Sequence, residues 1–212
     1  MVSSEEERLG NLHRLDPVQV SNILFLVPTL HRGDLTGCMD LLTIDEPAAE
    51  NVWSLGVTLS PNKRVENWER VVGAKPASFK IVSIGNHPED KAKEVAESYD
   101  FDPEPKFVTV PHGSDLTQIG VELIESLNEW EASSRRTVVC FHSISALLQY
   151  VSFERTFQFL NTFTNQIEQA DAVAHYHMNP EAHNHELLSK ISQLFDARVE
   201  LDPNDQWEVT IR

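Results

Sequence analysis

The chain reads, near its start, Ile23-Leu24-Phe25-Leu26-Val27-Pro28-Thr29-Leu30-His31-Arg32-Gly33-Asp34-Leu35-Thr36. The first five residues are all apolar, which is typical of a strand that is buried on both faces of a sheet. After the turn, apolar residues recur at helical spacing at Leu35, Cys38, Met39 and Leu42. A buried strand that leads directly into a helix is the beginning of a parallel α/β fold, so this segment decides the fold class.

The same alternation of apolar strands and amphipathic helices continues to the end of the chain. Further strands are expected at 51–59, 79–84, 107–110, 137–141 and 171–178. Helices are expected between them, including one capped by Asn86 and one capped by Asn179-Pro180. Residues 199–201 and 207–211 flank a turn and indicate an antiparallel hairpin at a sheet edge. We therefore predict one three-layer α/β domain at 21–212, with a mostly parallel sheet and helices on both faces, preceded by a polar lead-in at 1–20.

The charge balance excludes several function classes. The 212 residues contain 33 Asp and Glu but only 17 Lys and Arg, for a net charge of −16. No basic stripe is available to neutralise phosphates, so nucleic-acid binding is not expected. The sequence has no apolar run of membrane-spanning length and no secretory signal, which indicates a cytoplasmic protein without membrane insertion. An acidic surface poor in lysine is typical of a halophile, and an acidic protein with basic partners is the alternative.

The two cysteines, Cys38 and Cys140, both lie in apolar runs. They form no C-x-x-C pair. Buried free thiols in a reducing compartment are the interpretation that fits this placement.

The loop after the first strand has the position of a phosphate-binding loop but lacks the residues that define such a loop. A Walker A loop reads G-x-x-x-x-G-K-[ST], between a strand and a helix. Aligned on this segment, its first glycine is Pro28, its second is Gly33, its lysine is Asp34 and its magnesium-binding hydroxyl is Leu35. A carboxylate in place of the lysine repels phosphate. The remnant of a nucleotide site would include these four residues together with His31, Arg32, His142 and Ser143.

These segments resemble the RecA/KaiC-type ATPases, and most closely an uncharacterised haloarchaeal family of KaiC-like proteins with a degenerate phosphate loop. The similarity extends from about Asn22 to Ile211. In the active relatives, the strand at 137–141 is followed by an Asp and then Ser, and His142 takes the place of that Asp before Ser143. Those relatives also carry a glutamate pair before Ser-Pro, whereas here Leu59 precedes Ser60-Pro61. The resemblance therefore implies a pseudo-ATPase with no catalytic residue and no cofactor.

Histidines offer a competing hypothesis. His175 and His177 are two apart on a strand and so share a face. Together with His142, His183 and His185 they are the candidates for a metal site. Their spacing matches no established metal motif, so packing and hydrogen bonding are the favoured interpretation and no metal is expected.

We therefore expect a non-catalytic, cytoplasmic, archaeal KaiC-like protein that acts in signalling or regulation through protein–protein contacts. Its partners would be signalling proteins or a KaiC-like homologue. Two alternatives remain open from the sequence. The same cleft could serve a ligand- or metal-binding sensor or enzyme, or the chain could be an inert subunit of an assembly with an active KaiC-like ATPase.

Overall fold

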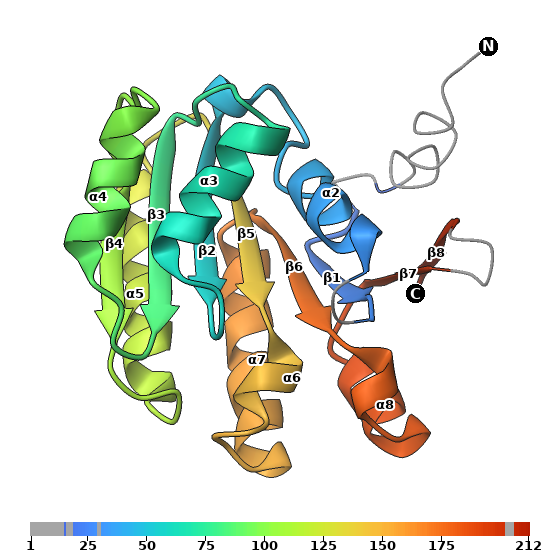
Figure 1. Cartoon of the computed structure of the whole chain (residues 1–212). Helices are drawn as coiled ribbons and strands as arrows, with labels where there is room; N and C mark the ends of the chain where they lie inside the picture. Colours follow the sequence, from blue (N-terminus) through green and yellow to red (C-terminus); the bar gives the residue numbers. More distant parts are fainter. Residues whose placement is uncertain (1–14, 16–18, 29–30, 202–205) are drawn as a thin grey trace.

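A single eight-stranded sheet runs through the molecule (Figure 1). The computed structural model describes residues 15, 19–28, 31–201 and 206–212, without the side chain of Arg32. The strand order is β4-β3-β2-β5-β6-β1-β7-β8, and only the β7–β8 pair is antiparallel. The strands are β1 (Asn22–Leu26), β2 (Glu50–Gly56), β3 (Ser78–Ile84), β4 (Lys106–Val110), β5 (Arg136–His142), β6 (Val173–Met178), β7 (Ala197–Leu201) and β8 (Trp207–Ile211).

Helices cover both faces of the sheet, as Figure 1 shows. One face carries α2 (Arg32–Asp40), α3 (Pro61–Val71) and α4 (Glu89–Ser98). The other carries α5 (Leu116–Trp130), α6 (Ile144–Leu147), α7 (Phe153–Gln169) and α8 (His185–Ser192). Two short 3-10 helices, η2 (Pro47–Ala49) and η3 (Pro180–Ala182), lie in the connections. The predicted α/β class, with a mostly parallel sheet and a C-terminal hairpin, is confirmed.

Alternation along the strands gives each face of the sheet its own apolar core, and the core on the α2 side consists of two clusters. In β2, Trp53 and Leu55 point to the α5–α7 side, whereas Val52 points to the α2–α4 side. Aromatic residues of α7 belong to the core on the α5–α7 side: Phe163 is buried, and Phe153 and Phe157 pack against this core. Burial at about 25 cal/mol per Å² makes these two apolar layers the main stabilising term of the fold.

Helix capping differs from the sequence prediction in two places. Asn86 does not cap α4, whose N-cap is Pro88 without a side-chain hydrogen bond. Asn179 caps only η3, and Asn184 caps α8 by accepting from the Leu187 N–H at 2.9 Å. In both cases the chain makes extra turns before the helix begins, and spacing alone does not reveal those residues.

The predicted polar lead-in at 1–20 lies almost wholly outside the described residues. Val20, at its end, is buried beside β1 and β7. No helix in the part of the chain that the structure describes is long and apolar enough to cross a membrane.

Candidate functional site

The carboxyl ends of β1, β6 and β5 lie side by side, because β6 pairs in parallel with both of its neighbours. Ligands of open α/β sheets gather at this edge. Helix α2 follows β1 directly and packs very closely on the sheet. A Cβ on Gly37 would lie 2.8 Å from atoms of Phe25 and Trp207, so a glycine is required there.

The amino end of α2 is occupied by its own side chains. His31 is the N-cap, and its Nδ1 accepts a hydrogen bond from the Gly33 N–H at 3.0 Å. Asp34 adds a negative charge in the first turn. Free N–H groups at a helix start attract phosphate, and here one of them is already bonded and a carboxylate stands beside it. This helix start is therefore poorly suited to hold a phosphate group.

Asp34 faces two of the candidate histidines. Its Oδ1 lies 2.9 Å from Nδ1 of His177, and its Oδ2 lies 3.8 Å from Nε2 of His142. The two imidazole rings are 4.5 Å apart. Burial alone would raise the pKa of Asp34, but the hydrogen bonds and charges of the two histidines outweigh burial and hold that pKa below its usual range. Asp34 is thus a fixed carboxylate that belongs to a side-chain network.

Below this network lies a buried cluster of sulfur and nitrogen groups. Cys38 from α2 and Cys140 from β5 have their Sγ atoms 3.6 Å apart and are both free thiols. Arg64 from α3 donates to both sulfurs, at 3.4 Å to Cys38 and 2.9 Å to Cys140. His175 Nε2 lies 3.3 Å from the Cys38 sulfur. The cysteines, Arg64 and both β6 histidines are all buried.

Electrostatics in this cluster depend on Arg64. A guanidinium stays charged in proteins, and Arg64 is only 2% exposed. Among the described residues, no carboxylate forms an ion pair with it, so the sulfurs are its counter-charge. Burial opposes ionisation of Cys140, but the contacts with Cys38 and Arg64 outweigh burial and lower the pKa of that thiol well below its usual range. The Cys140 thiol is therefore more acidic than an ordinary cysteine.

The two β6 histidines respond differently to the same surroundings. Burial lowers the pKa of His175, and the nearby Cys38 sulfur offsets this only in part. Burial also disfavours charge on His177, but the sulfurs of Cys38 and Cys140 and the Asp34 carboxylate outweigh it and raise the pKa of His177 well above its usual range. The charged neighbours of each imidazole decide the difference.

Only some of the predicted site residues come together. Asp34, His142, His175 and His177 do, whereas His183 Nε2 bonds the Ser145 hydroxyl at 2.8 Å and His185 begins α8. The remaining positions are accounted for individually: Leu35 packs on the α2–α4 core, Ser143 caps α6 by accepting from the Ala146 N–H, and Pro28 accepts from the His31 N–H. Thr29, Leu30 and the Arg32 side chain lie outside the described residues.

Sequence reasoning missed Arg64 and the meeting of the two cysteines. One signal was available for Arg64, because it precedes Trp68 by four residues and so lies on the buried side of α3. A charged residue on an apolar helix face indicates a buried partner, because burying an unpaired charge costs free energy. No comparable signal existed for Cys38 and Cys140, which are 102 residues apart and meet only through the packing of α2 on β5.

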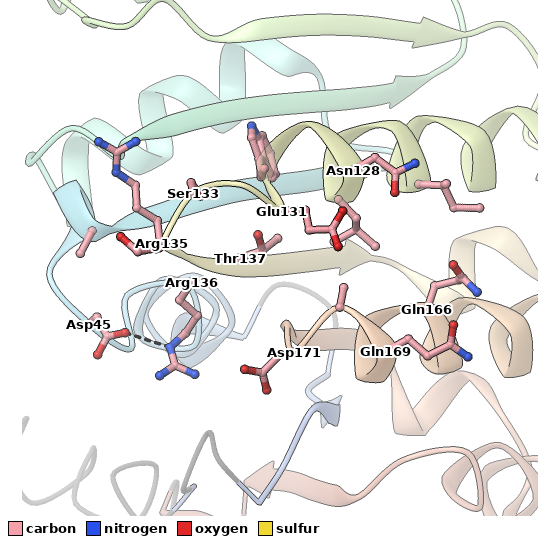
Figure 2. Close-up of a pocket in the computed structure, with 16 residues that line it drawn as sticks. Asp45, Asn128, Glu131, Ser133, Arg135, Arg136, Thr137, Gln166, Gln169 and Asp171 are labelled. Atoms are coloured by element: carbon pink, nitrogen blue, oxygen red, sulfur yellow. Dashed lines mark hydrogen bonds and ion pairs between the residues drawn. The ribbon is translucent and has the colours of Figure 1, made fainter.

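A large cavity lies at the opposite edge of the sheet. Its volume is about 590 Å³, and it is lined by residues at the start of β5, before β6 and at the ends of α5 and α7. Figure 2 shows its polar side chains, with the Arg136 guanidinium directed at the Asp45 carboxylate at 2.8 Å. The cavity is therefore separate from the Asp34 network, and the two do not form one site.

Structural relatives share the fold at very low sequence identity. A protein from a structural study of Project ID PH0250 from Pyrococcus horikoshii OT3 superimposes with a TM-score of 0.54 and 10% identity, covering 95% of this chain and 90% of that one. The uncharacterized protein PH0321 from Pyrococcus horikoshii, crystallised in complex with an unknown peptide, gives a TM-score of 0.52 and 9% identity, covering 91% and 83%. These likenesses concern the fold alone.

Sequence comparisons give the family. No curated protein matches the chain. A family model, described as a family of unknown function (DUF7504), matches residues 20–201. The chain therefore belongs to this family of unknown function, DUF7504.

Proposed function

We propose that the protein is a non-catalytic relative of the RecA/KaiC-like ATPases that acts in signalling or regulation through protein contacts. The observation that carries the loss of catalysis is the fixed position of Asp34, where a phosphate loop has its lysine. The carboxylate contacts His177 and lies near His142. These contacts hold its negative charge at the place where a phosphate would bind.

Electrostatics argue against a bound triphosphate. At an effective dielectric near 20 and ~4 Å, one pair of unit charges interacts by roughly 4 kcal/mol. Replacing a lysine with Asp34 changes attraction into repulsion of similar size. His31 also occupies the helix start that would donate to phosphate oxygens.

Magnesium and the attacking water lack partners as well. Leu35 offers no oxygen, and His142 offers an imidazole where magnesium prefers a carboxylate or water. The loop after β2 runs from Val57 to Ser60 and contains no acidic residue that could act as a general base. Three separate requirements of hydrolysis are missing.

Support for protein contacts comes from the outer surface of α5 and α7. A groove of about 450 Å³ lies between them and is lined mainly by apolar side chains. Val121 and Ile124 on α5 are 45% and 40% exposed beside it. Exposed apolar surface next to a groove is typical of an interaction site. The structural relative PH0321 was crystallised in complex with an unknown peptide. The signalling role itself rests on the family resemblance.

Calorimetry with Mg-ATP at high KCl tests the loss of catalysis. We expect no binding heat and no phosphate release from the wild-type protein. Asp34→Asn is the matched variant, because it removes the repulsive charge and keeps a side chain able to bond His177. It should still release no phosphate, since Leu35 and His142 are unchanged. Micromolar affinity or steady hydrolysis by the wild type would refute the proposal.

A further inference from the structure

We propose that Cys38, Cys140, His175 and His177 form a closed tetrahedral site for a zinc-type divalent ion. The four residues come from three elements: α2, β5 and β6. One ligand atom from each lies within 4.8 Å of every other. This proposal is independent of the loss of nucleotide chemistry. It replaces the set of five histidines that the sequence offered, of which two remain.

Two of the distances between the proposed ligand atoms are close to those around a tetrahedral ion. With Zn–S bonds of about 2.3 Å and Zn–N bonds of about 2.0 Å, tetrahedral angles place two sulfurs ~3.8 Å apart and a sulfur and a nitrogen ~3.5 Å apart. The Cys38 and Cys140 sulfurs are 3.6 Å apart, and Cys38 Sγ and His175 Nε2 are 3.3 Å apart. Each of these two separations is about 0.2 Å shorter than in the ideal tetrahedron. The same sulfur separation is far too long for a disulfide of about 2.05 Å.

The second ring nitrogen of His177 has a carboxylate partner, as metal-binding histidines commonly do. Metal-binding histidines commonly donate their other N–H to a carboxylate, which fixes the tautomer and the ring orientation. His177 Nδ1 lies 2.9 Å from Asp34, and its Nε2 is buried without a hydrogen-bond partner in the described structure. Phe25 packs edge-on against this ring at 4.9 Å and limits its rotation. The unpartnered nitrogen is the one left to bind the ion.

Arg64 acts as a supporting residue rather than a ligand. Its two N–H···S bonds are of the kind that stabilise metal-bound thiolates. With a divalent ion, two thiolates, Arg64 and Asp34 present, the formal charges cancel. A buried site without net charge avoids most of the cost of burying ions.

Chemistry and burial together specify the kind of ion. Two thiolates and two imidazoles in a tetrahedron select zinc over magnesium or calcium, which prefer oxygen. All four ligands are buried, so no coordination position remains open for water or substrate. The site is thus structural, and it holds α2 against β5 and β6.

A second group of side chains in the same region is an alternative metal site. Asp34, His142 and His177 could also hold an ion, but Asp34 and His142 are partly exposed and this set contains no sulfur. His177 belongs to both groups, so one ion would exclude the other arrangement. The two candidate sites can be told apart experimentally, because only the first binds the ion through thiolates.

Metal analysis and cobalt substitution test the proposal on the full chain. Protein purified under reducing conditions should contain zinc near one equivalent, and a chelator should lower its melting temperature. Cobalt added to the chelated protein should give tetrahedral visible bands together with ultraviolet thiolate-to-cobalt charge transfer. These readouts use only the wild type, so they do not depend on whether a variant folds.

Variants then assign the ligands. Cys140→Ser and His175→Gln should each weaken cobalt binding at least tenfold. Cys140→Ser should also weaken the charge-transfer band because one thiolate is lost, whereas His175→Gln should retain the band because both thiolates remain. His183→Gln is the matched control, since His183 bonds Ser145 outside the cluster, and it should leave the spectrum unchanged. Absence of metal with an unchanged melting temperature in chelator would overturn the proposal. Cobalt bound without charge transfer would overturn it as well, in favour of the Asp34–His142–His177 group.

Discussion

The two faces of β5 and β6 have opposite characters. Toward α5 and α7, these strands present Phe141 and Tyr176, whose rings stack 5.8 Å apart beside Phe163. Toward α2 and α3, the same two strands present Cys140, His175 and His177. Both faces are fully buried, so solvent exposure does not explain the difference.

Burial costs differ sharply between the faces. An apolar side chain gains free energy when it leaves water, whereas a buried polar group or charge must find a partner. On the α2 face, Arg64, two sulfurs, three histidines and Asp34 are all connected by contacts. The opposite face forms its core from apolar side chains without such a network. We infer that the α2 face keeps its polar groups for a bound ion.

The largest expected effect is at Arg64. Arg64→Ala removes a buried charge and both N–H···S bonds and leaves a cavity, so we expect a loss of about 3–5 kcal/mol in the free energy of unfolding. Denaturant titration at high KCl measures it. Leu160→Ala on the opposite face should cost a similar ~2–5 kcal/mol.

Chelation distinguishes these two variants. The cost of Leu160→Ala should be the same with and without chelator, because Leu160 lies in the apolar core. The cost of Arg64→Ala should change, because Arg64 touches both proposed zinc ligands. If the chelator changed the stability cost of both substitutions equally, the two faces would not differ in their dependence on a bound ion.

A second effect is expected at Glu50, a fully buried carboxyl on the α2 side of β2. Burial raises its pKa from 4.5 to about 7, although its Oε1 accepts the Asp45 N–H at 2.9 Å. A raised carboxyl pKa means that the folded state binds the proton more tightly. Its contribution to stability is therefore present below pH 4.5 and is lost as the pH rises through about 7.

Glu50→Gln should remove this pH dependence. Relative to wild type, the variant should gain stability between pH 5 and pH 8, by up to about 3 kcal/mol at 1.36 kcal/mol per pKa unit. Thermal melts across that range provide the measurement. A constant difference between variant and wild type at all pH values would show that Glu50 ionises normally.

A smaller effect is expected at Asp34. Asp34→Asn replaces a charge-assisted hydrogen bond to His177 with a neutral one, at a partly exposed position, so about 1–2 kcal/mol is expected in stability. Zinc affinity should fall more clearly, by about 10- to 100-fold, as for other residues that orient metal ligands. Competition with a chelator of known affinity measures this fall. An unchanged affinity would mean that Asp34 does not position His177.

Much of the fold could be predicted from the sequence, because strand and helix periods are strong in this chain. The buried run at 23–27 and the hairpin at the end both have clear patterns and were predicted correctly. The caps of α4 and α8 were wrong, since short turns precede those helices.

The site was only half visible in the sequence. Spacing placed His175 and His177 on one face and His142 at a strand end, as the structure has them. The structure adds the contacts of Asp34 with His177 and His142, which join residues more than 100 positions apart in the sequence. Contacts between Cys38, Arg64 and Cys140 depend on how α2 and α3 pack on the sheet, and no local pattern encodes that packing.

X-ray absorption at the zinc edge is the most direct test of the claim that the α2 face is built around an ion. The spectrum of protein purified under reducing conditions should fit two sulfurs at about 2.3 Å and two nitrogens at about 2.0 Å. Cys38 and Cys140 are the only cysteines in the chain, so two sulfurs identify both. A zinc shell of nitrogen and oxygen alone, or protein without zinc, would contradict this account.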